Sequence, residues 1–114
     1  MRFATKDFLS ESPDESGSVI CKLSTDRVRD MNEWSHSVKS GGYMSGSLRI
    51  SDCSDHIILD FDCTGQKGFD KRRAKLDKLI SKLQDMRNQM DHMWESHLRD
   101  VDFFKKEQEI KDAA

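Results

Sequence analysis

Apolar residues recur at every third or fourth position along the C-terminal part of the chain. Between residues 69 and 112 the sequence contains neither glycine nor proline. Counted as heptads from Leu76, its a and d positions are mostly Leu, Met and Phe, which places them along one stripe of a helix. The pattern predicts one long amphipathic helix over residues 69–112. Its a and d positions are Leu76, Leu79, Leu83, Met86, Met90, Met93, His97, Asp100 and Phe104, with Val101 beside Asp100 and with Ile80, Trp94 and Leu98 widening the stripe.

Two stretches before this helix alternate between apolar and polar residues. They cover residues 43–50 and 56–63, and such alternation is typical of strands with one buried face. The sequence SDCSD between them has turn chemistry, so a hairpin is predicted. The β-branched segment 18–23 predicts an earlier strand. Residues 24–40 carry apolar residues at helical spacing and end before two glycines, which predicts a helix.

These elements give the order β-α-β-β-α and an α+β fold. Because strand–helix–strand connections are nearly always right-handed, we expect a small three-stranded antiparallel sheet with residues 56–63 in the middle and both helices on one face. This arrangement is half of a ferredoxin-like fold. The predicted organisation is a flexible N-terminal arm over 1–17, a β-α-β-β core over 18–68, and the long helix over 69–112.

The predicted helix is longer than the predicted sheet. About 40 helical residues span about 60 Å, whereas a strand of seven or eight residues covers about 25 Å. The second half of the stripe would extend past the sheet, and exposed apolar stripes of that size usually mark an interface. We therefore expect this half to hold a homodimer together. The residues expected to take part are Met86, Met90, Met93, Trp94, His97, Leu98, Val101 and Phe104.

Two other outcomes stay open for the overhanging stripe. The helix can break near Asp100 and fold back, or the N-terminal arm can cover the stripe; no glycine or proline marks such a break. A polar residue at an a position, here His97, can fix the register of a coiled coil. It can also make pairing sensitive to pH, since the ordinary pKa of histidine is about 6.5.

The composition narrows the class of protein. With 114 residues, 35% of them hydrophobic and 35% charged, the chain has room for one small domain with a thin core. No apolar run reaches the roughly 20 residues of a membrane span, and the acidic N-terminal segment does not have the pattern of a signal peptide. The three cysteines form no CxxC pair, so we expect neither disulfides nor a zinc site, and a cytoplasmic location.

Charge is segregated along the predicted helix, although the net charge of the chain is only −2. Residues 67–87 carry eight basic and three acidic residues, and residues 88–112 carry four basic and seven acidic ones. This order opposes the helix dipole. It favours either an antiparallel partner helix, which sets each basic half beside an acidic half, or an anionic ligand. Lys71, Lys75, Lys78 and Lys82 fall within an arc of roughly 60° and form the best candidate for nucleic-acid contact.

The polar side of the predicted hairpin is the second candidate surface. It carries Tyr43, Arg49, His56 and the neighbouring carboxylates Asp60 and Asp62. Paired carboxylates can ligate a divalent metal or take part in acid–base chemistry. They occur more often in cross-strand charge pairs, such as Arg49 with Asp60 or His56. We therefore expect no catalytic residue, metal or cofactor.

These patterns favour a non-enzymatic, dimeric interaction protein: an inhibitor, adaptor or regulatory subunit that binds another macromolecule, a protein more readily than a nucleic acid. Viral and mobile-element accessory proteins are often small charged chains of this kind. The alternatives are a nucleic-acid-binding regulator using the basic first half of the long helix, and a small-ligand or metal site on the exposed sheet face. The residues expected to bind a partner or nucleic acid are Lys71, Lys75, Lys78, Lys82, Arg49, Tyr43, Asp60 and Asp62.

Overall fold

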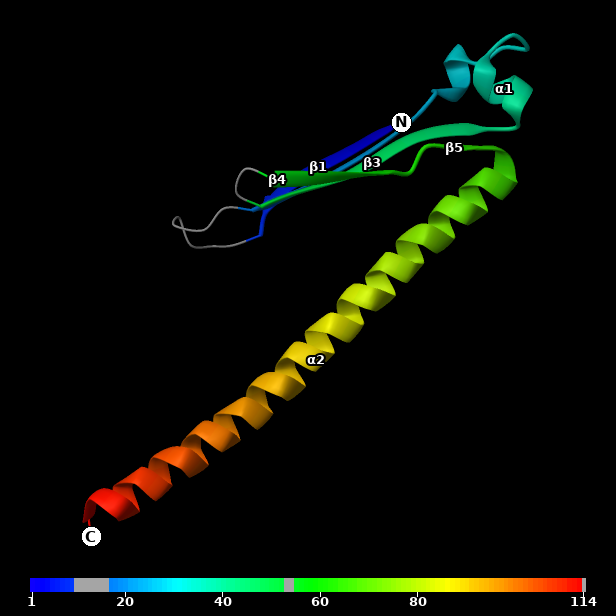
Figure 1. Ribbon diagram of the computed structural model, residues 1–114. Helices are drawn as coiled ribbons and strands as arrows, with labels where there is room; N and C mark the ends of the chain where they lie inside the picture. The colour runs from blue at the N-terminus through cyan, green and yellow to red at the C-terminus, as the bar shows by residue number, and fades with distance from the viewer. Residues whose placement is uncertain (10–16, 53–54, 114) are drawn as a thin grey trace. The chain divides into compact units, whose positions relative to one another are not determined.

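The computed structural model describes residues 1–9, 17–52 and 55–113 and confirms the α+β class. Its elements are β1 (Arg2–Phe8), β2 (Ser18–Thr25), the 3-10 helix η1 (Val28–Asp30), α1 (His36–Ser40), β3 (Tyr43–Asp52), β4 (Asp55–Asp60), β5 (Cys63–Thr64) and α2 (Gly65–Ala113). The chain divides into two compact units, which we call the sheet unit (Met1–Ala74) and the helix unit (Lys75–Ala114). Helix α2 begins in the sheet unit and continues through the helix unit (Figure 1).

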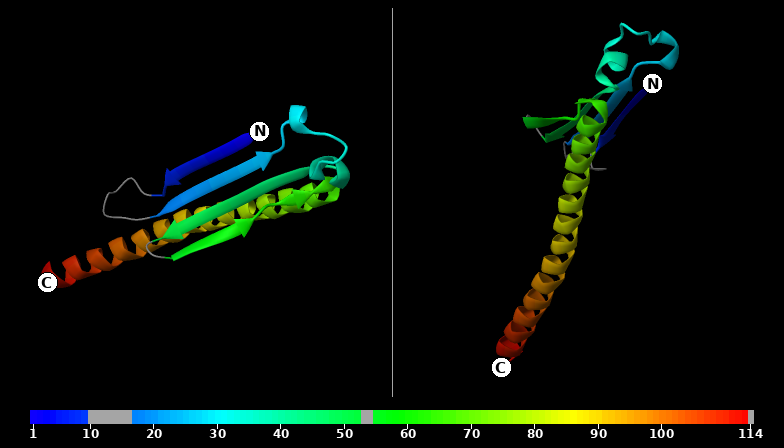
Figure 2. Two further views of the ribbon diagram at one scale, coloured as in Figure 1. Left: turned by 90° about the horizontal axis from the view of Figure 1, so that it is seen from above. Right: turned by 90° about the vertical axis from the view of Figure 1, so that its right-hand side faces the viewer.

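The sheet is antiparallel, with strand order β1-β2-β3-β4, and β5 also pairs with β3 (Figure 2). Its register confirms the alternation predicted for the hairpin. Leu48 lies opposite Leu59, and Ile50 lies opposite Ile57, so the apolar residues of both strands share one face. Cys21 of β2 joins the same face opposite Leu48.

The predicted three-stranded sheet is wrong in its strand number and its order. Residues 2–8, assigned to a flexible arm, form the edge strand β1, paired with β2 from Arg2 opposite Ser24 to Phe8 opposite Ser18. The α-amino group of Met1 continues this pairing by donating to the Thr25 carbonyl at 2.9 Å. The rest of the predicted arm, residues 10–16, lies outside the described residues. The central strand is β3, not residues 56–63. It pairs with β2 on one side, along the whole length of β2, and with β4 on the other.

The predicted helix over residues 24–40 is mostly absent. Ser24 and Thr25 continue β2 and lie opposite Ser45 and Met44, so their backbone groups are used by the sheet. Only η1 and the five-residue α1 are helical in this stretch. The predicted end of the helix is confirmed, since Gly41 closes α1 in the left-handed conformation with φ of 78°.

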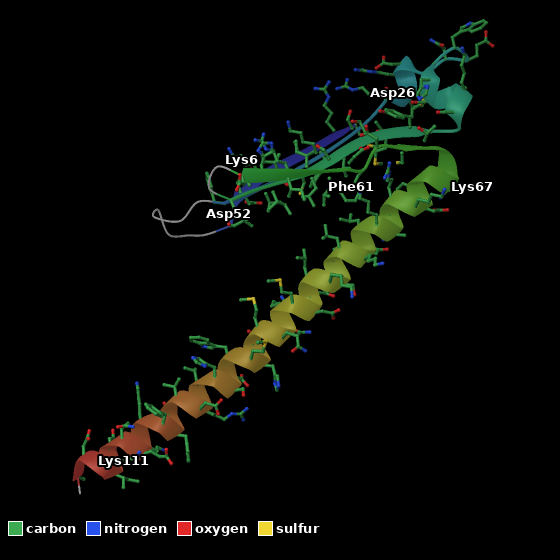
Figure 3. All side chains as sticks on the ribbon, viewed as in Figure 1. Lys6, Asp26, Asp52, Phe61, Lys67 and Lys111 are labelled. Carbon is green, nitrogen blue, oxygen red and sulfur yellow. The ribbon has the colours of Figure 1, made fainter. Side chains whose placement is uncertain are left out.

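Few side chains in the sheet unit are buried. Phe61 and Cys63, 9% and 8% exposed, are the buried hydrophobic residues of the described chain, and Ser37 is its buried polar one. Gly46 is buried as well, because the side chains of Leu23 and Phe61 lie close to its Cα. Figure 3 labels Phe61 where the chain passes from β4 to β5. The core is thus a small cluster at one place on the sheet.

The prediction of a single long C-terminal helix is confirmed. Helix α2 has 49 residues and no break near Asp100, so the chain does not fold back there. It starts four residues before the predicted position, because Gly65, with φ of 69°, allows the turn to lead straight into the helix. No helix in the described part of the chain is long and apolar enough to cross a membrane.

Candidate interaction surfaces

The apolar stripe of α2 is the most extensive candidate surface. Its side chains in the helix unit are largely exposed: Met90 by 61%, Trp94 by 62% and Phe104 by 60%. The described part of the helix unit consists of this one helix, so no other element within the unit can bury them. The residues of the stripe that were predicted to self-associate all lie on this continuous helix.

Helix α2 is much longer than any strand of the described sheet. Its 49 residues correspond to about 73 Å, whereas β3, the longest strand, has 10 residues and spans about 33 Å. The helix is therefore more than twice as long as the longest strand.

His97 is the one polar residue among those predicted to self-associate. The His97 ring lies 5.8 Å from the Trp94 ring, centroid to centroid, with the ring planes inclined at 39°. Residues three apart on a helix share a face, so the indole and imidazole form a single aromatic surface within the stripe. Any surface that covered this part of α2 would have to accommodate both rings.

The predicted lysine row follows one flank of this stripe. Lys71, Lys78 and Lys82 are exposed and Lys75 is half-buried. At 100° per residue, the same flank continues past Met90 as Asp100, Glu107 and Lys111. The flank is therefore basic in its first part and carries two acids and one base in its second.

The polar sheet face brings together only part of the predicted set. Arg49 lies opposite Ile58, so His56 and Asp60 are its diagonal neighbours. Tyr43 lies near the other end of β3, opposite Thr64, and its ring packs edge-on against His36 at 5.2 Å. Arg49 and Tyr43 thus lie at different places along β3 and do not form one cluster.

Asp60 and Asp62 have structural partners in the sheet unit. The Asp62 carboxylate accepts the Gly46 amide at 2.8 Å, and Asp60 Oδ1 accepts the Asp62 amide at 2.8 Å. Both bonds hold the short segment between β4 and β5. The alternation predicted Asp60 and Asp62 as neighbours on the outer face of one strand, but β4 ends at Asp60 and Asp62 lies between β4 and β5.

Arg72 is a site residue that the sequence did not reveal. It is the third point of this cluster: its Nε donates to the Asp62 carbonyl at 2.9 Å, and its Nη2 lies 3.8 Å from Asp60 Oδ2. No local sequence pattern predicts the role of Arg72, because its contacts join the first turns of α2 to residues at and just after the end of β4. Among the described residues, no group of three His, Cys, Asp or Glu side chains is placed to hold a metal ion.

A hollow of about 570 Å³ lies at the α1 end of the sheet unit. Its lining is mostly apolar or glycine and includes Val38, Met44 and Phe69. Two of its polar side chains, Asp26 and Ser37, are hydrogen-bonded to each other (Figure 3 labels Asp26). The hollow could receive an apolar group but offers no paired acid and base.

No family model, curated protein or solved structure matches this chain. Function must therefore be inferred from the surfaces described above, of which the stripe of α2 is the largest.

Proposed function

We propose that this chain is a non-enzymatic, dimeric interaction protein, in which α2 joins two copies and the dimer binds another macromolecule as an inhibitor, adaptor or regulatory subunit. One observation carries the proposal: α2 is more than twice as long as the longest strand and bears an apolar stripe along most of its length. Removing such a stripe from water is the main driving force of helix pairing.

The engagement of the acidic residues supports the non-enzymatic part of the proposal. Acid–base or metal chemistry needs carboxylates that can reach a substrate or ion. The Asp62 carboxylate accepts the Gly46 amide, and Asp60, whose side chain is 60% exposed, accepts the Asp62 amide and lies 3.8 Å from Arg72. The unlinked Cys21 and Cys63 are in keeping with a cytoplasmic location.

Two features support a protein as the target. The exposed Arg49 and the half-buried Tyr43 lie on the polar face of the sheet, and these residue types are enriched at protein interfaces. The strands β1 and β4 are the outer members of the described sheet, and outer strands can pair with an extended segment of a target.

Mass measurement by light scattering tests the self-association. The full chain at about 50 μM should have twice the 13.2 kDa chain mass, and a chain ending at Gln89 should be a monomer, since it lacks half of the stripe. Circular dichroism of the shortened chain should retain the strand signal, which shows that the sheet unit remains folded. A full-length chain that stays monomeric would contradict the proposal.

Nucleic-acid binding is a second candidate, favoured by the exposed lysines of the row on α2. It predicts that affinity for a short duplex falls steeply as salt rises, because lysine contacts release counterions. Lys78→Glu with Lys82→Glu should then abolish binding, whereas Arg99→Glu, outside the row, should not. Absence of binding at 50 mM salt would eliminate this candidate.

A further inference from the structure

One series of residues along the stripe of α2, eight apolar ones and His97, is symmetric about Met90. From Leu76 to Met90 the stripe advances by steps of 3, 4, 3 and 4 residues, and from Met90 to Phe104 by 4, 3, 4 and 3. A strict heptad repeat would place Met93 and Asp100 in the second half. Trp94 and Val101 take those places in the symmetric series. The series is Leu76, Leu79, Leu83, Met86, Met90, Trp94, His97, Val101 and Phe104.

This symmetry matches α2 to a second, antiparallel copy of itself. When two identical helices run in opposite directions around a two-fold axis at Met90, residues equally far from Met90 lie at the same height, since the rise per residue is constant. The stripe then forms nine layers without a gap. They pair Leu76 with Phe104, Leu79 with Val101, Leu83 with His97 and Met86 with Trp94, on both sides of a Met90 pair. The whole series lies within the helix unit.

The charges on the lysine flank fit the same register. In an antiparallel pair related by a two-fold axis, each flank of one helix faces the same flank of the other. Lys78 and Lys82 then lie on either side of Asp100 of the second copy, each about 3 Å from its height. Lys71 and Lys75 flank Glu107 of the second copy in the same way, while Lys111 of that copy lies within two residues of the height of Lys71.

The opposite flank brings two further opposite-charge pairs together and one like-charge pair, Lys105 beside Arg73 of the second copy. Arg87 lies beside Asp91 of the second copy, and Arg73 lies beside Glu109, each within two residues of equal height. Ile80 and Leu98, which widen the stripe on this flank, face each other across the pair. The residues that a narrow two-helix seam would leave exposed therefore meet one another.

A parallel pair lacks these matches. It would set the basic segment 67–87, with eight basic and three acidic residues and thus a net charge of +5, beside its own copy. The acidic segment 88–112, with a net charge of −3 from four basic and seven acidic residues, would also face itself. Like charges across a seam oppose pairing, so charge and apolar spacing favour the same orientation.

We propose that two copies of α2 pair antiparallel with their two-fold axis at Met90, in the register that sets Leu76 against Phe104. This inference rests on the proposed self-association and adds its orientation and register. The occupant of the apolar stripe is thus a second copy of this chain, whose Asp100 and Glu107 lie among the four lysines of the row.

Cysteine cross-linking of the full-length chain tests the register. A disulfide needs Cα atoms within about 7 Å, so each link reports one pair of positions. Under mild oxidation, Met90→Cys should link to itself, whereas Leu76→Cys alone and Phe104→Cys alone should give no link at the new cysteine. The double variant Leu76→Cys/Phe104→Cys should give a link between its two positions in different chains. These positions lie about 42 Å apart on one helix, so an intrachain link cannot form.

The unmodified chain is the control for Cys21, Cys53 and Cys63, and peptide mapping identifies the linked residues.

Each outcome separates this inference from the proposed function. A self-link at Leu76→Cys would show a parallel pair and overturn the antiparallel register, while leaving the dimer in place. A chain that is dimeric by light scattering but forms no Met90 self-link and no 76-to-104 link would overturn the register alone. A monomeric unmodified chain would overturn both.

Discussion

The sheet unit and the helix unit differ in how far apart in sequence their interacting residues lie. In the sheet unit, structure depends on partners far apart in sequence: β1 pairs with β2, and the Gly46 amide finds its acceptor on Asp62, 16 residues away. In the helix unit, every backbone bond is local to α2, but the apolar side chains have no partner within the unit. The sheet unit thus supplies long-range partners for its own backbone, whereas the helix unit leaves most of its large apolar side chains exposed. Substitutions in the two units should accordingly affect different quantities.

The largest effect is expected for Met90→Glu. In the proposed register it places two carboxylates together at the two-fold axis, and an unpaired buried charge costs several kcal/mol. The dissociation constant of the dimer should rise at least about 100-fold, since about 1.4 kcal/mol corresponds to a factor of ten. Sedimentation equilibrium measures it. Asn88→Glu adds the same charge on the opposite side of the helix and should change little; equal effects of the two variants would refute a seam through Met90.

Gly46→Ala should destabilise the sheet unit by about 1–3 kcal/mol, as overpacking does in tight sites. A Cβ at Gly46 would lie 2.9 Å from Leu23 Cδ2 and 3.1 Å from Phe61 Cβ, and the latter atom is fixed to the backbone. Gly68→Ala is the matched control. Its added Cβ would meet Cys63 at an ordinary 3.8 Å, and replacing a helical glycine should stabilise by about 0.5–1 kcal/mol. Urea unfolding at fixed protein concentration measures both, and shifts of the same sign would contradict this account.

Asp62→Ala should lower the free energy of unfolding by about 1–2 kcal/mol, because the buried Gly46 residue loses the acceptor of its amide. Asp62→Asn keeps an oxygen at the same place and should cost clearly less. Thermal unfolding of both variants separates the two roles of the side chain. If the two substitutions cost the same, the charge of Asp62 rather than its hydrogen bond holds the segment between β4 and β5.

The smallest effect is expected for His97→Leu, which should tighten the dimer about fivefold. In the proposed register His97 packs against Leu83 of the second copy, and removing an imidazole from water without a partner costs free energy. His92→Leu, on the far side of the helix, should leave the dissociation constant unchanged. A loosened dimer in His97→Leu would show that the imidazole makes a specific contact across the seam.

The same contrast explains which parts of the fold could be predicted. The long helix was predicted almost to its ends, because its periodic residues and the absence of glycine and proline are local properties of residues 69–112. The alternation of β3 and β4 was also local, and their register confirms it. The pairing of β1 could not be read from residues 2–8, because their charged and apolar residues give no hint of the strand that would receive them.

The residues of the candidate surfaces also divide into those set by local helical geometry, which could be predicted, and those set by distant partners, which could not. Ser24 and Thr25 are residue types that often cap helices. Both are paired with β3 in the sheet, so the helix predicted from residue 24 does not form. The role of Asp62 escaped prediction because its acceptor bond goes to Gly46 on another strand. The stripe and the lysine row needed only helical geometry, and the continuous α2 supplies it. Their roles in pairing remain predictions.

The continuity of α2 between the two units has a consequence for binding strength. In the proposed antiparallel pair, the two Gly65 residues stand about 75 Å apart along the axis, since each lies 25 residues from Met90. The dimer would carry two copies of the same sheet unit, each continuous in the chain with one α2. Such a molecule is bivalent: on a target with repeated sites it can gain a factor of about 10² to 10⁴ in avidity without any new contact. That gain vanishes when the sites cannot be spanned, so the length of α2 would select targets by the spacing of their sites.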